Sequence, residues 1–311
     1  MTGSLTRRAD SALVFDIQRL ALDDGPGIRT NIFFQGCPLA CVWCHNPESR
    51  AEMPRLAFNK ALCRACGACA EVCPQGVHGF EEQGGRVQHL VAHDACERCG
   101  SCLDVCCHDA LALVGRWYTV DELLREIGTD RPYYRIGEGG GITLTGGEPM
   151  HQAGFLALLL DRLDGTHVCI ETCGHARSED FRALAPRVDL FLFDYKATDP
   201  ERHRRLCGVD NALILANLEL LCAMGRRVAL RLPLVAGVND DEDHLRGVAA
   251  LVEHLPAIEY VQIMPYHNLG AGKLERLGLT TPMLRRPSAS AEQKASWRAR
   301  LVALGVPDVR V

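Results

Sequence analysis

Two cysteine runs of identical spacing constrain the fold of this chain more than any other feature. One run spans residues 63–73 and the other spans residues 96–106, 33 positions later, and each reads Cys-x2-Cys-Gly-x-Cys-x3-Cys. A segment with four thiolates this close together must wrap around whatever they bind, so the ligand decides much of its conformation. Zinc sites do not need four cysteines in this tight order, which favours cubane iron-sulfur clusters.

The spacing is that of bacterial ferredoxins, in which three cysteines of a run hold one 4Fe-4S cluster and the fourth reaches across to the other cluster. We therefore expect two clusters with crossed ligands: Cys63, Cys66, Cys69 and Cys106 for one, and Cys96, Cys99, Cys102 and Cys73 for the other. Pro74 follows the first run as the pattern requires, whereas Cys107 stands where the second proline would be. Cys107 is an alternative ligand to Cys106, although the spacing favours Cys106.

A third group of cysteines, the triplet, lies upstream of both runs and consists of Cys37, Cys41 and Cys44. Three thiolates hold three irons of a cubane and leave the fourth iron open to a substrate, whereas an electron-carrying cluster normally has four cysteine ligands. The alternative is zinc with a distant fourth ligand. Zinc pairs usually repeat further along the chain, and no second pair stands beside this loop, so the triplet favours a cluster with an open iron.

Composition limits the class and the location of the protein. At 311 residues with 47% hydrophobic content, the chain suggests one large domain or two ordinary ones. Residues 1–10 are polar, and no stretch approaches about 20 apolar residues, so we expect a cytoplasmic protein without a membrane segment. In that setting sixteen cysteines indicate metal ligation rather than disulfides. A net charge of -5 gives no reason to expect nucleic acid.

Strands and helices alternate along the rest of the chain. A capping box at Thr119 and Glu122 begins one helix, and apolar residues at helical spacing mark others near 156–163, 214–221 and 245–255. The expected strands are Asn31–Gln35, Ile142–Thr145, His167–Glu171, Val188–Asp194, Arg227–Leu234 and Ile258–Pro265. About six such units predict an α/β fold with parallel strands, a partial (β/α)6 TIM-like barrel made of residues 1–50 and 116–311, with residues 51–115 inserted as a ferredoxin-like domain.

Polar residues gather at the expected strand ends, where a parallel barrel carries its chemistry. Each of these residues, taken alone, has an alternative explanation as a helix cap, a turn residue or a member of a surface ion pair. Their coincidence at five strand ends makes that alternative weaker. The strand ends carry the triplet, Gly146-Gly147-Glu148-Pro149, Glu171-Thr172, Asp194-Tyr195-Lys196 and Met264-Pro265-Tyr266-His267, and Arg231 lies within the fifth strand. The paired glycines let a ligand approach the backbone closely and leave N–H groups free to bond it.

With these residues in place, the sequence resembles the radical S-adenosylmethionine (SAM) enzymes, whose Cys-x3-Cys-x2-Cys signature the triplet matches. Within them it is similar to the activating enzymes of glycyl radical enzymes, the relatives of pyruvate formate-lyase activating enzyme that carry a two-cluster insert. The resemblance extends over nearly the whole chain. It includes the insert and the segments Asp24–Thr30, Trp43–Ser49, Thr145–Pro149, Asp194–Lys196, Arg231–Asp240 and Pro265–His267.

The resemblance implies a reaction. The open iron of the triplet cluster would bind the amino group and carboxylate of SAM, and one electron would cleave SAM to methionine and a 5′-deoxyadenosyl radical. That radical would remove hydrogen from a backbone glycine of a large partner, a glycyl radical enzyme. A radical SAM enzyme acting on a small molecule is the main alternative, and a multi-cluster electron-transfer protein is a second one. The Asp24–Thr30 segment and the doubled insert weigh against the first, and the open triplet with its large barrel weighs against the second.

The resemblance also implies residue roles. Gly146, Gly147 and Glu148 would hold the amino group of SAM, Lys196 and Arg231 would meet its carboxylate, and Asp194 and His267 would lie along the nucleoside. A monovalent cation beside the carboxylate would be held by Glu171, Thr172 and Asp194, with glutamate where aspartate is expected in the family. The two insert clusters would relay electrons from a flavodoxin or ferredoxin, or dock the partner.

Overall fold

The computed structural model describes residues 6–136, 139–280 and 283–311, so the first five residues of the expected 1–50 segment lie outside the described residues. A nine-stranded sheet forms the main body, in the order β13-β12-β11-β10-β9-β8-β2-β1-β7. Seven neighbouring strands pair in parallel: β2 (Arg29–Phe34), β8 (Gly141–Gly146), β9 (His167–Thr172), β10 (Leu190–Asp194), β11 (Val228–Leu234), β12 (Ile258–Pro265) and β13 (Val309–Arg310).

The six expected parallel strands are therefore present, and β8 to β12 follow one another along the chain and in the sheet. Two antiparallel strands at the other edge, β1 (Ser11–Ala21) and β7 (Arg116–Thr119), were not expected from the sequence. Within the described residues, β7 and β13 are not paired, so the sheet stays open. This agrees with the expected partial barrel.

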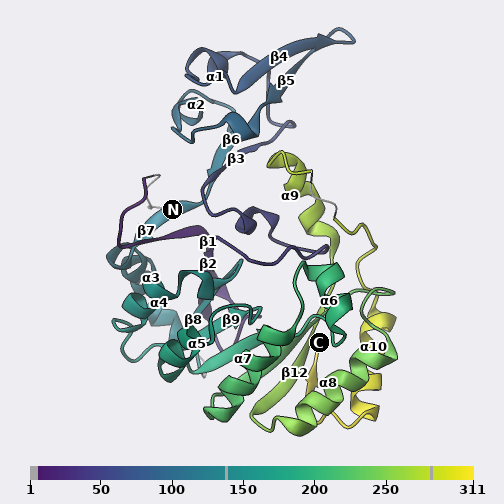
Figure 1. Ribbon diagram of the computed structural model, residues 1–311. Coiled ribbons are helices and arrows are strands. Elements are labelled where there is room, and N and C mark those ends of the chain that lie inside the picture. The colour runs from purple at the N-terminus through teal and green to yellow at the C-terminus, as the bar shows by residue number, and fades with distance from the viewer. Residues whose placement is uncertain (1–5, 137–138, 281–282) are drawn as a thin grey trace.

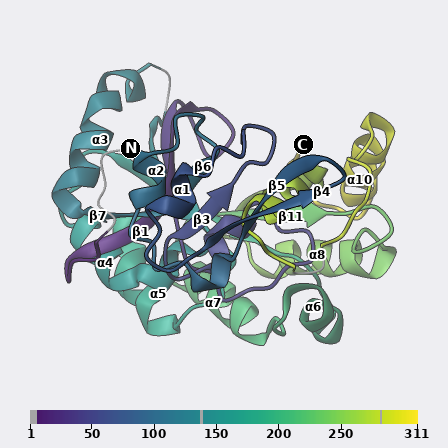
Figure 2. The ribbon, with the colours of Figure 1, turned by 90° about the horizontal axis from the view of Figure 1, so that it is seen from above.

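Helices cover the sheet and bury its apolar side chains (Figures 1 and 2). They are α3 (Val120–Tyr134), α4 (Ala153–Leu160), α5 (Ser178–Leu184), α6 (Pro200–Cys207), α7 (Ala212–Ala223), α8 (Glu242–His254) and α10 (Ala291–Ala303). The predicted capping box begins α3, with the Thr119 side chain and the Glu122 side chain each bonding the other residue's backbone N–H. Short 3-10 turns complete the connections: η1 (Pro47–Arg50), η2 (His93–Ala95), η3 (Pro149–Gln152), η4 (Ala185–Arg187) and η5 (Asn268–Gly270).

The central strands are buried along their length, as parallel strands covered by helices must be. In β10 the first four residues are buried, and in β11 only Pro233 is half-buried. The main apolar core joins these strands to the helices, with Phe181, Phe191 and Leu218 among its fully enclosed residues. Since the strands run in parallel, their C-terminal ends meet on one side of the sheet, which is where the polar strand-end residues lie.

The insert forms a separate small unit at one end of the molecule (Figure 1). It contains two antiparallel pairs, β3 (Arg55–Phe58) with β6 (Leu111–Val114) and β4 (His78–Gln83) with β5 (Arg86–Val91), and the one-turn helices α1 (Ala68–Glu71) and α2 (Ser101–Asp104). Gly67 and Gly100 precede these helices with φ angles of 84° and 87°, a conformation that favours glycine. The glycine that recurs in the two runs thus adopts the same left-handed backbone conformation in each copy.

The insert contacts the main body through α9 (Ala271–Arg276) and the turn that follows it. Arg55 Nε donates to Leu277 O at 2.8 Å, and Lys60 Nζ lies 3.1 Å from Glu275 Oε1. Figure 1 shows α9 beside the insert. These contacts join two parts of the chain that are more than 200 residues apart in sequence.

Among the described helices, none is by itself long and apolar enough to cross a membrane. Helices α6 and α7 reach the required length and composition only as a pair, with a bend of 108° between them.

Candidate active site and cluster cavities

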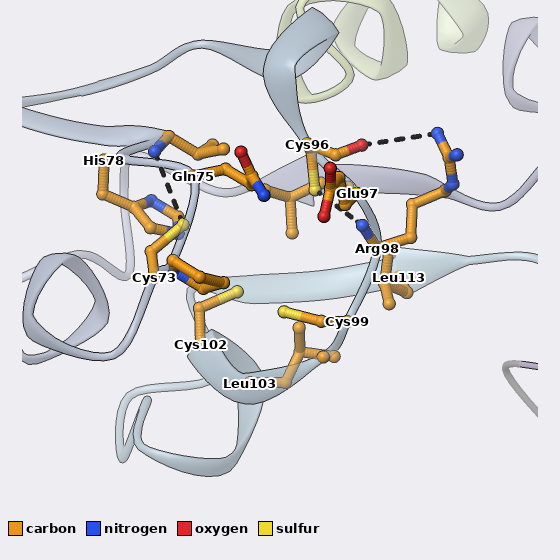
Figure 3. A pocket seen from close by; sticks show the side chains of 14 residues that line it. Cys73, Gln75, His78, Cys96, Glu97, Arg98, Cys99, Cys102, Leu103 and Leu113 are labelled. Atoms are coloured by element: carbon orange, nitrogen blue, oxygen red, sulfur yellow. Dashed lines mark hydrogen bonds between the residues drawn. The ribbon is translucent and has the colours of Figure 1, made fainter.

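Two cavities in the insert collect the cysteines of the two runs. A cavity of about 330 Å³, the first-run cavity, is lined by Cys63, Cys66, Cys69 and Cys106. A cavity of about 370 Å³, the second-run cavity, is lined by Cys73, Cys96, Cys99 and Cys102, and Figure 3 shows its sulfur atoms near one another. Each cavity thus takes three cysteines from one run and the last cysteine of the other run. The chain folds in this way because each run turns back at its short helix and sends its fourth cysteine toward the other cavity.

Cys107 stands apart from both groups. Cys106 is half-buried and lies on the wall of the first-run cavity, whereas Cys107 is exposed and lies on the wall of neither cavity. Of the two alternatives that the spacing left open, this placement favours Cys106.

Backbone N–H groups point at the cysteine sulfurs in the same way in both runs. Ala65 N donates to Cys63 Sγ at 3.3 Å, and Arg98 N donates to Cys96 Sγ at 3.4 Å. Such bonds favour thiolate, the form that binds iron. The donor set of each cavity, four cysteines, therefore fits a cubane cluster.

The triplet loop, residues 35–46, follows β2 and is fixed to the end of α6. Ala40 N donates to Cys207 O at 2.7 Å, and Val42 N donates to Leu206 O at 2.9 Å, both at the end of α6. The loop therefore takes its position from a helix about 160 residues away in sequence.

The three triplet thiols lie together in a buried group with two further cysteines. Burial, together with the neighbouring thiols of Cys41 and Cys37, raises the pKa of Cys44 to about 12. Cys173 and Cys207 pack in the same buried cluster as Cys37, Cys41 and Cys44. Neither Cys173 nor Cys207 belongs to a spacing pattern, so sequence reasoning gave them no role. The triplet alone supplies three adjacent thiols on one loop, as an open cluster requires.

A cavity of about 860 Å³, the strand-end cavity, opens beside the triplet loop at the C-terminal ends of the parallel strands. Its wall comes from the strand ends, the triplet loop and α9: Asp24, Phe33, His45, Asn46, Thr145, Gly146, Gly147, Glu171, Thr172, Cys173, Asp194, His267 and Lys273. Six of the nine residues expected to bind SAM or a cation thus lie on it. Glu148, Lys196 and Arg231 are not among the residues of the wall.

Glu148 is fully buried and its carboxylate bonds within the protein. It accepts hydrogen bonds from Met150 N at 3.0 Å, from Cys173 N at 2.7 Å and from Thr172 Oγ1 at 2.8 and 2.9 Å. With these acceptor positions filled, the placement differs from the expectation that Glu148 meets a substrate amino group. The carboxylate instead joins the end of β8 to the end of β9.

The two glycines before Glu148 serve the packing of the triplet loop. Gly147 N donates to Phe34 O and Glu148 N donates to Gly36 O, each at 2.9 Å, so these N–H groups are not free for a ligand. A Cβ at Gly147 would lie 2.5 Å from Gly36 O, and one at Gly146 would lie 2.2 Å from Phe34 O. The glycines allow the triplet loop to pack directly against the end of β8 while forming part of the cavity wall.

Arg231 is fully buried behind the cavity and is held by four groups of the protein. Its Nη1 lies 2.7 Å from Glu171 Oε1 and 3.1 Å from Asp24 Oδ1, its Nη2 donates to Asp23 O, and its Nε donates to Gln262 Oε1. Burial alone would lower its pKa, but the facing carboxylates hold the pKa above its ordinary value. This differs from the expected direct contact with a substrate carboxylate.

Lys196 is arranged in the same way. It is buried, and its Nζ donates to Asp194 Oδ2 at 2.5 Å. Burial would lower its pKa, but Asp194 and the thiols of Cys41 and Cys173 raise the pKa well above the ordinary value. Both cations therefore lie behind carboxylates that face the cavity. The sequence could not show which of these charged residues line the cavity and which lie behind it.

Of the three residues expected to hold a monovalent cation, Glu171 and Asp194 present carboxylates at the wall. The Thr172 hydroxyl donates to Glu148 and accepts from Gly174 N, so it is engaged on both sides. Asp24, which sequence reasoning gave no role, adds a third carboxylate. Three carboxylates here face the two cations Arg231 and Lys196, which leaves one formal negative charge.

Two stacked imidazoles close another side of the cavity. The rings of His267 and His45 lie 3.8 Å apart at an angle of 20°. His267 Nδ1 and His45 Nε2 are buried and have no hydrogen-bond partner among the described residues. Burial lowers the pKa of His45 to about 4 and also lowers the pKa of His267. The pair therefore offers neutral rings with free polar edges, which suit a planar base.

Besides Asp24, two further ionisable wall residues were missed as candidates, His45 and Lys273. His45 directly follows Cys44, inside a segment that matches the family, and this position was a usable signal. Lys273 belongs to no motif, and its Nζ lies 2.9 Å from Asn46 Oδ1 and 2.6 Å from Glu48 Oε1. Only the folding of α9 against the triplet loop brings Lys273 to the cavity.

Comparisons with known proteins agree with this arrangement. The radical SAM superfamily matches residues 105–247, and a 4Fe-4S dicluster domain matches residues 62–110. A solved radical SAM methyltransferase from Sphaerobacter thermophilus shares the fold, with a TM-score of 0.51 and 16% identity over 96% of this chain and 76% of that chain.

The curated relatives are closer in sequence. The choline trimethylamine-lyase activating enzyme of Oleidesulfovibrio alaskensis is 46% identical over 90% of this chain and 91% of its own length. The trans-4-hydroxy-L-proline dehydratase activating enzyme of Clostridioides difficile is 41% identical over 85% of this chain and 87% of its own length. These matches favour an activating enzyme over the small-molecule and electron-transfer alternatives. The chain therefore belongs to the activating enzymes of glycyl radical enzymes, within the radical SAM superfamily.

Proposed function

We propose that the triplet cysteines hold the cluster that cleaves SAM and that the strand-end cavity holds SAM itself. The single observation that carries this proposal is the position of the cavity, which lies beside the triplet loop and is lined by the ends of four parallel strands. When bound, SAM supplies methionine and the 5′-deoxyadenosyl radical that takes hydrogen from a glycine of the partner. The role of the chain is to position SAM against the open iron and to exclude water from the cavity.

The charge of the cavity supports this occupant. SAM carries an ammonium, a carboxylate and a sulfonium, so its net charge is positive, and the three carboxylates backed by two buried cations leave a net negative charge. We assign the ammonium to the carboxylate face formed by Glu171 and Asp194, and the adenine to the side formed by His45 and His267. A monovalent cation near Glu171 and Asp194 is also part of the proposal, as the counter-ion of the SAM carboxylate.

Lys196 and Arg231 act indirectly in this proposal. Because each lies behind a carboxylate, each keeps that carboxylate ionised and fixed in the wall rather than contacting SAM. Glu148 fixes the ends of β8 and β9 against the triplet loop. These three residues shape the site, whereas Gly146, Gly147, Asp194 and His267 line it.

We further propose three 4Fe-4S clusters, with two in the insert, and a division into a barrel of residues 1–50 and 116–311 and an insert of residues 51–115. The crossed groups of four cysteines in two separate cavities support the two insert clusters. The separate strand pairs and the small apolar core of the insert support the division. A flavodoxin or ferredoxin is the proposed electron donor, and the cytoplasm, where thiols stay reduced, is the proposed compartment.

The partner is a glycyl radical enzyme. The 46% identity to a choline trimethylamine-lyase activating enzyme makes a choline trimethylamine-lyase the first partner to test. A trans-4-hydroxy-L-proline dehydratase is the second. The partner that acquires a glycyl radical signal in electron paramagnetic resonance (EPR) after incubation with reduced protein and SAM identifies the substrate class.

Anaerobic reconstitution tests the cluster assignment. The chain should bind about twelve irons if three cubanes form, and Cys41→Ala should bind about eight. The reduced chain should release 5′-deoxyadenosine from SAM, and the variant should not. Cys107→Ala, which alters an exposed thiol outside both cavities, is the matched control and should retain about twelve irons and full release. Release of 5′-deoxyadenosine by Cys41→Ala would contradict the proposal.

A further inference from the structure

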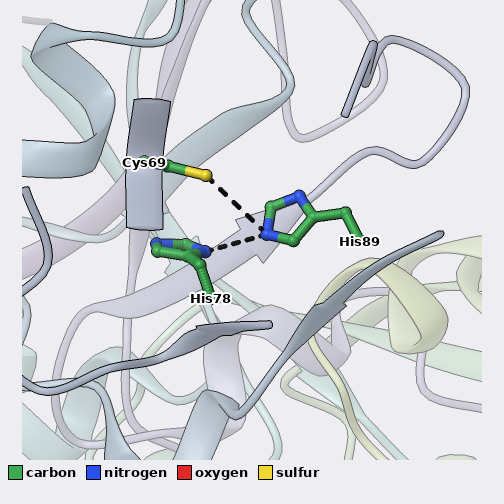
Figure 4. Close-up of side chains that lie close together, drawn as sticks. All are labelled: Cys69, His78 and His89. Carbon is green, nitrogen blue, oxygen red and sulfur yellow. Dashed lines mark hydrogen bonds between the residues drawn. The ribbon is translucent and has the colours of Figure 1, made fainter. Parts of the chain in front are cut away.

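A pair of histidines from the hairpin of β4 and β5 lies between the two cluster cavities. His89 is on the wall of the first-run cavity, and His78 is on the wall of the second-run cavity. His78 Nδ1 and His89 Nε2 are 3.0 Å apart, which is a hydrogen bond (Figure 4). Both rings are buried, with 6% and 7% of their surface exposed. The pair therefore forms a direct polar connection between the two cavities.

His89 also reaches the sulfur atoms of the first-run cavity. Its Nδ1 lies 3.4 Å from Cys63 Sγ, and its Nε2 lies 3.8 Å from Cys69 Sγ. The ring is held in this position by Phe80, which stacks on it with ring centroids 4.6 Å apart, and by Phe58 at 4.4 Å. Since packing fixes the ring on both sides, its nitrogen atoms have a set direction.

The hydrogen bonds determine which nitrogen carries the proton. A neutral imidazole has one N–H, and a thiolate can only accept. Because the Cys63 thiolate can only accept, His89 Nδ1 carries the proton and donates it to Cys63 Sγ. His89 Nε2 then has no proton and accepts a hydrogen bond from His78 Nδ1–H. The remaining nitrogen, His78 Nε2, then carries no proton, and it is buried without a hydrogen-bond partner among the described residues. The bonds thus run in one direction, from His78 through His89 to a cluster sulfur.

This donor does not belong to the cysteine repeat. The backbone N–H bonds to Cys63 and Cys96 recur at the same place in both runs and come with the repeat itself. The second-run cavity also receives Val77 N on Cys73 Sγ at 3.4 Å and has the Ser101 hydroxyl near Cys99 Sγ at 3.5 Å. Within the described part of the insert, an imidazole contacts cysteine sulfurs only in the first-run cavity. The contact of His167 Nδ1 with Cys169 Sγ at 3.9 Å lies in the main body and involves no predicted cluster ligand.

Hydrogen bonds to cluster sulfurs raise the reduction potential, because they stabilise the extra negative charge of the reduced cluster. We propose that His89, oriented by His78, is a positioning residue that sets the reduction potential of the cluster in the first-run cavity independently of its neighbour. This inference rests on the proposed assignment of the two insert clusters. The hairpin would thereby tune one step of the electron path without changing the cysteine ligands.

A separate metal ion bound by Cys69, His78 and His89 is the competing interpretation, since their ligand atoms all lie within 4.8 Å of one another. It is disfavoured because Cys69 Sγ faces the first-run cavity and because the short His78–His89 contact uses one nitrogen of each ring. Metal analysis distinguishes the two interpretations.

The test uses the full chain with Cys37→Ala, Cys41→Ala and Cys44→Ala, so that only the insert clusters remain. This background should bind about eight irons. Its two reduction potentials are then measured by EPR-monitored titration with dithionite. His89→Phe, which keeps a ring against Phe80 but removes the donor, should make reduction of one cluster about tenfold less favourable, a shift of about 59 mV to lower potential, and leave the other potential unchanged.

Three further variants separate donation from packing. His89→Gln, which retains an N–H donor, should recover part of the potential. His78→Phe should shift the same cluster in the same direction by a smaller amount, because packing still holds the His89 ring but the hydrogen bond that keeps its proton on Nδ1 is lost. His108→Phe is the matched control, since His108 is exposed on the same cavity wall and makes no hydrogen bond to a sulfur among the described residues.

The outcomes distinguish this inference from the proposed function. Iron far below eight in the background itself contradicts the cluster assignment. With the iron retained, unchanged potentials in His89→Phe overturn the role of His89 alone. Loss of about four irons in both His89→Phe and His89→Gln would make His89 a ligand rather than a donor. One extra metal per chain that disappears in His78→Phe would establish the separate metal site instead.

Discussion

Replacing Arg231 with methionine should expose how the strand-end cavity holds its charge. The change removes the guanidinium that faces Asp24 and Glu171 and keeps an apolar stem of similar length. Removing one partner of a fully buried ion pair costs about 3 to 5 kcal/mol. The Asp24 and Glu171 side chains keep exposures of 22% and 23% at the cavity, so water can reach them. We therefore expect a loss of roughly 2 to 3 kcal/mol in the free energy of unfolding.

A double variant isolates the electrostatic part of this loss. Arg231→Met with Glu171→Gln no longer leaves Glu171 as an unpaired charge, so it should be roughly 1 kcal/mol more stable than Arg231→Met alone. The assay is anaerobic urea unfolding followed by circular dichroism, on reconstituted proteins of equal iron content, with Glu171→Gln completing the cycle. Equal stabilities for the single variant at Arg231 and the double variant would refute the reasoning, because Arg231 would then not act by neutralising Glu171.

Three further predictions concern the site and the insert. Gly147→Ala places a Cβ 2.5 Å from a carbonyl oxygen of the triplet loop and should lower iron binding by the triplet, whereas Gly154→Ala, with nothing within 4 Å, should not. His267→Ala removes a ring stacked on His45 and should weaken SAM binding about fivefold in calorimetry, as expected for roughly 1 kcal/mol of stacking. Iron chelation should make residues 55–114 sensitive to limited proteolysis before the barrel, because few apolar residues hold the insert together.

Each of these has an outcome that would count against it. Full iron loading of Gly147→Ala would show that the triplet loop can move away from β8 without losing its cluster. Unchanged SAM affinity in His267→Ala would place the adenine elsewhere in the cavity. Simultaneous cleavage of the insert and the barrel after chelation would mean that the clusters also support the main sheet.

Much of the fold followed from patterns along the chain. Buried apolar runs separated by helical periodicity specify parallel strands, because only helices on the sheet can cover such strands. Strands β1 and β7 were missed although β1 is joined to β2 by a short connection, because β7, the other partner of β1, begins only after the insert. A pairing of this kind leaves little local signal.

The cysteine groups were predictable for a related reason. Ligand spacing is a local property, and a short loop of fixed spacing can hold only certain metal centres. The crossed grouping of the two runs in two cavities corresponds to the assignment made from spacing, although Cys107 could be set aside only once its exposure was known.

The tertiary structure determined which polar residues line the strand-end cavity and which lie behind its wall. Sequence position indicated that Glu148, Lys196 and Arg231 lie near the strand ends but not which of them face the cavity. A buried charge needs a partner of opposite charge, so the partners that the fold supplies determine where each charged side chain lies. Arg231 is held behind Asp24 and Glu171, and Lys196 is held behind Asp194.

The sequence by itself predicted the grouping of the cysteines, the parallel α/β barrel and the resemblance to the activating enzymes, because these depend on short-range spacing and periodicity. Only the tertiary structure decided which charges face the strand-end cavity, which glycines serve packing, and that Lys273 and the pair of His78 and His89 reach the strand-end cavity and the insert cavities. The physical reason is that contacts between distant segments depend on how whole elements pack, and no local pattern records them.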